Sequence, residues 1–245
     1  GRDGHQQLLE GTSLRHKALL PVGGKPMVLS VFDAACQSRY GLKVSISTED
    51  PDIKALETAV PFTVLPSGNS AVQSLLQGVK HTDEDTDWIL FISADHPLLT
   101  TEMIDYFIEQ VLAGNNEFCA AVVGRNLVQQ HYPESKRTYL PVKGNGFSGA
   151  NMYMLKKAAF TGESSYLETI DRNRKAHWKS ILKLDPISIV QGLLRLLTIH
   201  ELVARANRLV GCRCGVVEMP WPEACMDVDK LSDKDIAEAI LAKRG

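Results

Sequence analysis

The sequence lacks the features that mark several classes of protein. Its 245 residues carry 27 basic and 29 acidic side chains, and the formal net charge of −2 gives no basic footprint for nucleic acid or an anionic membrane surface. No apolar run is long enough to span a bilayer, and no signal-peptide pattern opens the chain. We therefore expect no nucleic-acid partner, no membrane association and a cytoplasmic location.

Cysteine, histidine and serine motifs are also scarce. The five cysteines are an odd number, and Cys212-Arg213-Cys214 does not have the C-x-x-C spacing of a zinc or redox pair. The histidines form no i, i+4 pair, and the chain contains no G-x-S-x-G motif. These absences indicate a reduced protein without a disulfide framework, a helical zinc site or a serine-nucleophile signature.

What the sequence does contain is an alternation of apolar strands and amphipathic helices as far as Val123. This alternation predicts an α/β fold with a doubly wound, mostly parallel sheet and helices on both faces. Residues 163–210 are expected to be mostly helical, as a helical elaboration within a single domain spanning residues 1–245. Residues 126–143 are mixed and polar, and a hairpin turn is predicted at Gly144-Asn145-Gly146.

The most informative stretch lies near the middle of the chain. Trp88–Ile92 are all apolar and predict a central strand, buried on both faces, that ends at Ser93-Ala94-Asp95. Open α/β sheets bind ligands at the carboxyl ends of their strands, so Asp95 is placed to hold a divalent cation. The alternative is that Asp95 only caps the helix predicted to start near Thr100.

Two other regions have side chains suited to phosphate or cation binding. Lys17 precedes an apolar stretch and a Gly-Gly turn, where a lysine can approach phosphates, although an ordinary surface lysine is the better interpretation of this residue alone. Near the C-terminus, Asp227 and Asp229 are expected to point to opposite faces of an extended chain, so one of them could join the strand-end carboxylate in an oxygen shell. Asp233 or Ser232 suits a helix cap better.

Three segments, taken in order, resemble the nucleotidyltransferases that act on sugar phosphates and cofactors. Lys17 to Met27, K-A-L-L-P-V-G-G-K-P-M, resembles their K-x-L-x-x-x-x-G-K-P-M/L segment. Ser93 to Pro97, S-A-D-H-P, is similar to their metal-binding strand end, and Asp227 to Asp233, D-V-D-K-L-S-D, to their closing D-[IV]-[DN]-T-P-E-D. Within this family the chain most resembles the members with a domain like molybdenum cofactor guanylyltransferase. A largely uncharacterised bacterial branch of these members is similar in the segment Lys136-Arg137-Thr138-Tyr139, in the F-S-G-A-N-M-Y segment and in the helical block of residues 187–210.

The resemblance implies a Rossmann-like sheet of the glycosyltransferase-A type. It also implies Mg²⁺-dependent transfer of a nucleoside monophosphate from an NTP to a small phosphorylated acceptor, with release of pyrophosphate. By motif, Lys17 and Asp95 would be catalytic, and Asp95 and Asp229 would bind the metal. The residues implied to bind the nucleotide are Gly1, Arg2, Lys17, Lys25, Gly68, Asn69 and Ser70.

Two alternative functions remain open at this point. A glycosyltransferase that uses a nucleotide sugar would have the same kind of sheet, but it usually carries D-x-D where this chain has Asp95-His96-Pro97. A non-catalytic nucleotide-binding or interaction protein could keep the fold without the phosphate loop, whose strand would precede Gly1. A homo-oligomer is compatible with either, since the apolar residues in 187–210 could cover an acceptor pocket or a dimer interface.

Overall fold

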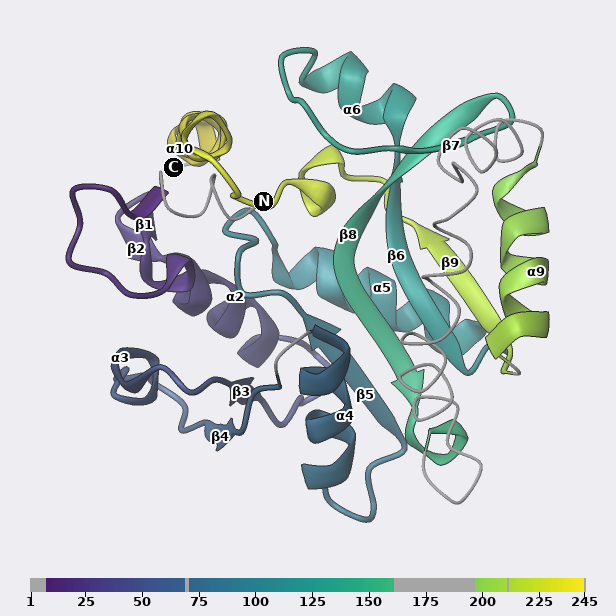
Figure 1. Cartoon of the computed structure of the whole chain (residues 1–245), viewed down its shortest axis with the longest axis horizontal. Coiled ribbons are helices and arrows are strands. Elements are labelled where there is room, and N and C mark those ends of the chain that lie inside the picture. Colours follow the sequence, from purple (N-terminus) through teal and green to yellow (C-terminus); the bar gives the residue numbers. More distant parts are fainter. Residues whose placement is uncertain (1–7, 69–70, 161–196, 211, 245) are drawn as a thin grey trace, which may run out of the picture.

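The structure is a computed structural model of the chain, and it describes residues 8–68, 71–160, 197–210 and 212–244. Its main sheet has the strand order β5-β8-β6-β9, with β7 paired to β8 (Figure 1). The bounds of these strands are β5 Trp88–Ile92, β6 Phe118–Gly124, β7 Leu140–Val142, β8 Asn145–Lys156 and β9 Cys214–Glu218. Two small sheets accompany it, formed by β1 Pro21–Val22 with β2 Lys25–Pro26 and by β3 Ser45–Ser47 with β4 Thr63–Leu65.

Helices connect most of these strands. In chain order they are η1 Lys17–Leu19, α2 Met27–Cys36, α3 Pro51–Lys54, α4 Ala71–His81, α5 Thr101–Ala113, α6 Arg125–His131, η2 Lys157–Ala159, α9 Ile199–Val210, η3 Pro222–Cys225 and α10 Leu231–Arg244. Among the helices in the described ranges, none combines the length and the apolar character needed to cross a bilayer.

Helix α5 shows how the local sequence sets an element and its buried face. The side chain of Thr100 accepts a hydrogen bond from the Met103 amide, which satisfies one of the free N–H groups of the first turn. The chain then continues with apolar residues at helical spacing until the cap at Gly114. The buried residues are Met103, Ile104, Phe107, Ile108 and Val111.

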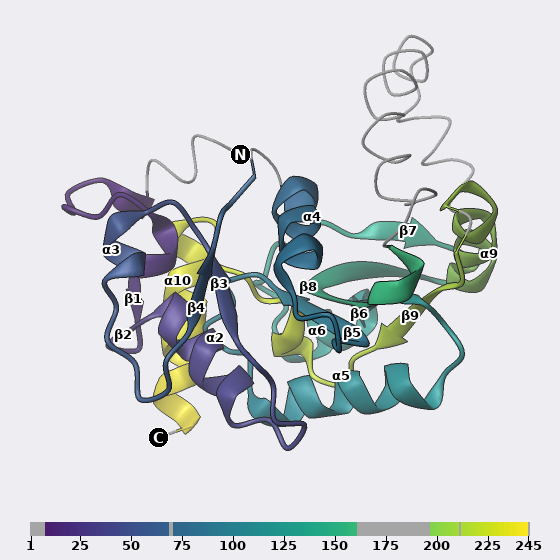
Figure 2. The same ribbon diagram turned by 90° about the horizontal axis from the view of Figure 1, so that it is seen from below.

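Strand β5 separates two apolar layers, which confirms that helices cover both faces of the sheet. Leu90 and its alternate neighbours pack on the larger core, to which α5 contributes. Ile89 belongs instead to a smaller core that includes Val79 of α4. Figure 2 shows α5 and α4 on opposite sides of the sheet, as this alternation requires.

The α/β class and the Rossmann-like arrangement are confirmed, but two details of the sheet differ from expectation. The sheet is mixed rather than mostly parallel, because β8 runs antiparallel to β5, β6 and β7, while β6 and β9 are parallel. Strand β5 has the predicted bounds, but it is the first strand in the order of the five-stranded sheet and not a central one. It is also not buried on both faces, because Ile89 is its one buried residue. Strand direction is set by long-range pairing, which an apolar run does not encode.

The segment before β8 also differs from the prediction. Helix α6 occupies Arg125–His131. All but the first residue of this helix lie in the stretch 126–143, which was described only as mixed and polar. The hairpin is confirmed, but Val142 pairs with Asn145, so its turn consists of Lys143 and Gly144 rather than residues 144–146. Gly144 has a φ of +82°, a conformation that favours glycine.

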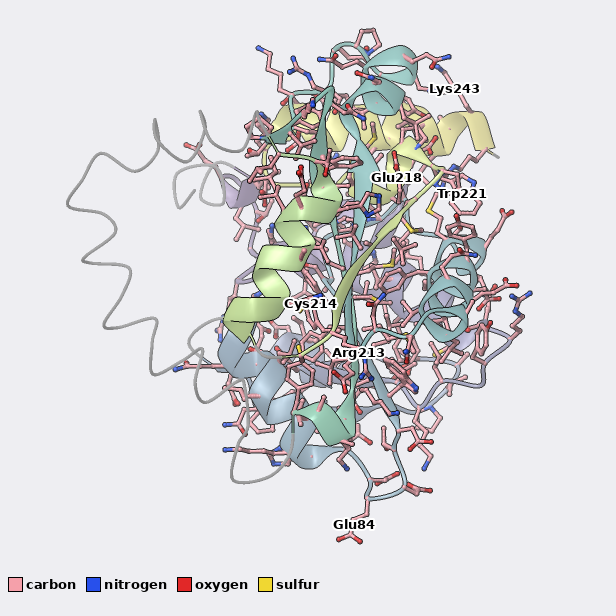
Figure 3. All side chains as sticks on the ribbon, turned by 90° about the vertical axis from the view of Figure 1, so that its right-hand side faces the viewer. Glu84, Arg213, Cys214, Glu218, Trp221 and Lys243 are labelled. Carbon is pink, nitrogen blue, oxygen red and sulfur yellow. The ribbon has the colours of Figure 1, made fainter. Side chains whose placement is uncertain are left out.

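Much of the predicted helical elaboration, residues 163–196, lies outside the described residues. The part that is described is α9, which packs along β9 and is joined to it by a hydrogen bond from the Cys214 amide to Oδ1 of Asn207, at 2.7 Å. Figure 3 shows α9 crossing the outer side of the sheet beside the strand that runs from Cys214 to Glu218. The single domain of residues 1–245 stays a prediction.

Candidate functional site

Three of the predicted residues meet where β5 ends. Lys17 comes from η1, Asp95 from the loop after β5, and Asp229 from the segment before α10. The ammonium nitrogen of Lys17 lies 2.6 Å from Oδ2 of Asp95 and 2.5 Å from Oδ1 of Asp229. The fold therefore gathers the motif residues from both ends of the chain and its middle at one place.

The backbone around this ion-pair cluster is also tied together. The amide of Val228 donates to the carbonyl oxygen of Asp95 at 3.0 Å, and Lys17 lies 3.4 Å from the Val228 carbonyl oxygen. The hydroxyl of Ser93 donates to Oδ1 of Asp95 at 2.5 Å. Because Val228 is fully buried, the chain on either side of it is held against the end of β5.

A third carboxylate belongs to the same cluster. Asp95, Asp227 and Asp229 each offer one oxygen, and these three atoms lie within 4.8 Å of one another. The expectation that Asp227 and Asp229 point to opposite faces was wrong, because both carboxylates approach Asp95. Residues two apart on an extended backbone share a face, so the buried Val228 leaves its two acidic neighbours on the side that faces Asp95.

The charges in the cluster stabilise one another despite partial burial. Burial opposes the charged form of Asp95, but the attraction of His96 and Lys17 outweighs it and lowers the pKa of this carboxyl below its ordinary 3.8. Burial likewise opposes the charge of Lys17, but Asp95 and Asp229 raise the pKa of its ammonium above 10.5. A carboxylate–ammonium pair is thus the stable ionic state at neutral pH.

Asp227 has a different environment from its two partners. Burial raises the pKa of its carboxyl above 3.8, although His96 and Arg137 act in the opposite direction. Its Oδ2 accepts a hydrogen bond from Nδ2 of Asn151 at 3.3 Å. Its Oδ1 accepts a short hydrogen bond from the guanidinium of Arg137, so both of its oxygens have protein donors.

His96 supports the cluster from the interior. Its side chain is almost completely buried, with an exposed fraction of 1%, and Nδ2 of Asn151 lies 3.0 Å from its Nε2. Burial lowers the pKa of this histidine, although the charges of Asp95 and Asp227 act in the opposite direction. His96 is thus a packing residue behind the carboxylates. Asn151 itself has a φ of +49°, in the left-handed region.

Lys25 and Gly68 lie apart from the contacts described above. Lys25 forms a short ion pair with Asp33 of α2, and both side chains are well exposed. The Gly68 amide donates to Oγ of Ser74 at 3.0 Å, so this residue packs on the start of α4. The remaining predicted nucleotide-binding residues, Gly1, Arg2, Asn69 and Ser70, lie outside the described part of the chain.

Sequence reasoning missed three residues of this site. Asp227 was considered, and a correct use of the two-residue strand period would have included it. Asn151 lies in the segment Gly144–Met154, which is rich in small residues, and nothing in that pattern singles out this side chain. Arg137 lies in the Lys136–Tyr139 segment that the resemblance included, but no role was inferred for it, because its contacts to Asp227 and Asp233 span about 90 residues of sequence.

The comparison with protein families gives this geometry a context. Residues 11–177, more than half of the chain, match the family model of the MobA-like NTP transferase domain. The chain therefore belongs to the MobA-like NTP transferase family, as the three motif segments indicated.

Two named relatives are cytidylyltransferases. The chain is 25% identical over 118 residues to a 3-deoxy-manno-octulosonate cytidylyltransferase from Pelodictyon phaeoclathratiforme, an alignment that covers 47% of each protein. The chain thus spans about half the length of this relative. It is also 25% identical over 237 residues to a 2-C-methyl-D-erythritol 4-phosphate cytidylyltransferase from Streptomyces avermitilis, which covers 93% of this chain and 85% of that protein.

Solved structures support the same fold. A protein described as a hypothetical transferase from Thermus thermophilus superposes with a TM-score of 0.71 at 27% identity, and the match covers 91% of both chains. A CMP:2-keto-3-deoxy-manno-octonic acid synthetase in complex with CTP gives a TM-score of 0.62 at 14% identity, covering 96% of this chain and 95% of that chain. The second likeness concerns the fold alone.

Proposed function

We propose that this chain is a nucleotidyltransferase that moves a nucleoside monophosphate from an NTP to a small phosphorylated acceptor. The observation that carries the proposal is the meeting of Lys17, Asp95 and Asp229 at the end of β5, in a member of an NTP transferase family. The names of the relatives favour CTP as the donor, and one of them names a 4-phosphate acceptor. A sugar phosphate or an alditol phosphate is therefore the acceptor class to test first.

We further propose that the reaction uses Mg²⁺. Asp95, Asp227 and Asp229 offer three carboxylate oxygens within 4.8 Å, the hard donors that Mg²⁺ prefers. The ammonium of Lys17 already lies between two of these carboxylates, which shows that the position attracts a positive charge. The residues thus fit the ion, which when bound would supply charge neutralisation at the NTP phosphates.

The side chains of this site suit such a transfer without a dedicated base. An oxygen of the acceptor phosphate is already anionic at neutral pH, so it can attack the α-phosphorus directly. The new bond joins that oxygen to the α-phosphorus, while the bond from the α-phosphorus to the bridging oxygen breaks and pyrophosphate leaves with the electron pair. Lys17 would stabilise the charge on the NTP phosphates, once they draw its ammonium from the carboxylates.

A thermal-shift panel of ATP, GTP, CTP and UTP, each with and without Mg²⁺, tests the donor. A nucleotide at about 100 times its dissociation constant should add roughly 2.7 kcal/mol to the free energy of unfolding. That corresponds to several degrees in melting temperature, at about 2–4 °C per kcal/mol for a chain of this size. We expect CTP with Mg²⁺ to give the largest shift, and pyrophosphate release with a set of sugar and alditol phosphates then to identify the acceptor.

The same panel can contradict the proposal. If no nucleotide raises the melting temperature in the presence of Mg²⁺, the proposed NTP binding is wrong, and a role without catalysis becomes the better account. A shift with a nucleotide other than CTP would keep the transferase and replace the donor.

A further inference from the structure

Arg137 is a nearly buried cation that no part of the proposed chemistry uses directly. It lies in the irregular segment between α6 and β7, and its side chain is only 7% exposed. Its Nη1 forms a short hydrogen bond to Oδ1 of Asp227 and a second one, at 2.9 Å, to the carbonyl oxygen of the same residue. The guanidinium therefore fixes both the side chain and the backbone of one member of the carboxylate cluster.

The other nitrogens of the guanidinium extend this hold. Nη2 lies 3.2 Å from Oδ1 of Asp233, and Nε donates to Oγ of Ser135 at 3.3 Å. Asp233 is itself 4% exposed, and its Oδ2 accepts from the amides of Asp229 and Lys230, each at 3.2 Å. Arg137 thus reaches Asp227 directly and the backbone of Asp229 through Asp233.

This arrangement needs an arginine for two reasons. Asp227 is partly buried next to Asp95 and Asp229, so without a cation its charge would be repelled and poorly solvated. The two carboxylates of Asp227 and Asp233 also have to be bound at the same time, and the planar guanidinium provides several donors in fixed directions. A lysine ammonium would supply the charge but not several donors in fixed directions.

We propose that Arg137 is the positioning residue that aligns Asp227 and Asp229 with Asp95 for binding a divalent cation. It does so without touching the cation or the substrate, by clamping the segment from residue 227 to residue 233 at both ends. This inference rests on the proposed function, because it assigns to Arg137 a task in the metal site of that transferase. That task is to hold the carboxylate oxygens of Asp227 and Asp229 close to that of Asp95.

Mn²⁺ alone, titrated into nucleotide-free protein and followed by the electron paramagnetic resonance of free Mn²⁺, measures the site without turnover. We expect R137M to weaken Mn²⁺ binding about 10- to 100-fold, the range found when residues that orient metal ligands are removed. R137K should lie between R137M and the wild type. The matched control is R213M, which removes an exposed ion pair with Glu117 at the start of β9 and should leave Mn²⁺ binding unchanged.

The position of the control residue makes the comparison fair. Figure 3 shows Arg213 at the opposite end of β9 from Glu218 and Trp221, and the chain continues from Trp221 toward Asp227.

A double-mutant cycle with D227N adds a second test. Because Arg137 acts largely through Asp227, R137M should cost much less Mn²⁺ affinity in the D227N background than in the wild type.

Folding is monitored by circular dichroism, so that a loss of structure is not taken for a loss of alignment. If R137M does not fold, R137K and the D227N background carry the comparison. Mn²⁺ affinity in the folded R137 variants equal to that of the wild type would overturn the inference, even if their melting temperatures fall. Additive costs of R137M and D227N would also overturn it.

The outcomes separate this inference from the proposed function. Wild-type protein that binds Mn²⁺ and loses it in R137M, but transfers no nucleotide, would keep the role of Arg137 and remove the transferase. If the wild type transfers nucleotide and R137M has unchanged Mn²⁺ affinity, the transferase is supported and the role of Arg137 is overturned. Wild-type protein that does not bind Mn²⁺ would overturn the inference together with the proposed metal.

Discussion

The ammonium of Lys17 lies 2.6 Å from Oδ2 of Asp95, so the lysine that we propose to be catalytic and a candidate metal ligand form an ion pair at the end of β5. The same nitrogen also contacts Asp229, and the three groups come from distant segments of the chain. In this state the lysine is the counter-ion of the carboxylates that we propose to hold Mg²⁺. Cation binding and lysine release should therefore be linked.

Replacing Lys17 with methionine tests that link. Because the ammonium and a divalent cation are attracted to the same oxygens, K17M should bind Mn²⁺ without nucleotide about tenfold more tightly, a change of roughly 1.4 kcal/mol. Pyrophosphate release should nevertheless fall at least about 100-fold, because the NTP phosphates lose a preorganised positive charge. The control is K43M, since Lys43 forms an exposed pair with Asp83. Unchanged Mn²⁺ affinity in K17M would show that the two cations do not compete.

Replacing Asp95 with asparagine removes charge at nearly constant shape. The variant should lose Mg²⁺-dependent transfer by at least about 100-fold, because the cation and Lys17 both lose a charged partner. Its melting temperature should stay close to that of the wild type, because the asparagine oxygen can face Lys17 while its amide nitrogen donates to the hydroxyl of Ser93, which can accept as well as donate. D83N, which alters an exposed carboxylate, serves as the control for charge loss alone. Wild-type turnover in D95N would exclude Asp95 from the site.

Gly68 tests the turn that precedes α4. A Cβ atom at this position would lie 2.2 Å from Cβ and 2.7 Å from the backbone carbon of Gln73, contacts that require the backbone to move. G68A should therefore lower the free energy of unfolding by about 1–3 kcal/mol. It should also reduce the thermal shift produced by the preferred NTP, because the family resemblance places base contacts at this turn.

The matched variant for this prediction is G149A. Gly149 has open space around an added Cβ, so its replacement should change stability by less than about 0.5 kcal/mol. Chemical denaturation of both variants, followed by the NTP panel, gives the comparison. Equal stability of G68A and G149A would mean that the turn accommodates the methyl group.

Tyr132 contacts η3, which precedes Asp227 in the chain, and this contact gives a pH-dependent prediction. Its hydroxyl donates to Oε1 of Glu223 in η3 at 2.5 Å, and burial, with the Glu223 charge as a further cause, raises the pKa of Tyr132 to about 12. Below pH 10 this tyrosine is neutral in both states, so its contribution to stability is fully present. Between pH 10 and 12 the unfolded chain ionises first, and the free energy of unfolding should fall.

The variant Y132F lacks this ionisation, so its stability should depend less on alkaline pH. Urea unfolding of both proteins at several pH values from 9 to 11 measures the difference between them, in which the other tyrosines cancel. We expect the advantage of the wild type to shrink as the pH rises above 10. A difference that stays constant over this range would show that Tyr132 has an ordinary pKa.

The local elements and the order of the motif residues could be predicted from the sequence alone. The apolar run Trp88–Ile92 has the bounds of β5, and the spacing of apolar side chains after Thr100 gave the buried face of α5. Both follow from short-range periodicity, which the next few residues of the chain fix. The resemblance of three ordered segments likewise singled out Lys17, Asp95 and Asp229, which the fold then brought together.

The tertiary structure alone decided which of the candidate side chains meet. Lys25 and Lys17 belong to one motif, yet Lys25 forms its ion pair with Asp33 while Lys17 crosses to Asp95 and Asp229. The antiparallel direction of β8 and the contact of Arg137 with Asp227 likewise depend on pairing between segments far apart in the chain. Such contacts are selected by the packing and charge balance of the whole fold, and no local spacing in the sequence encodes them.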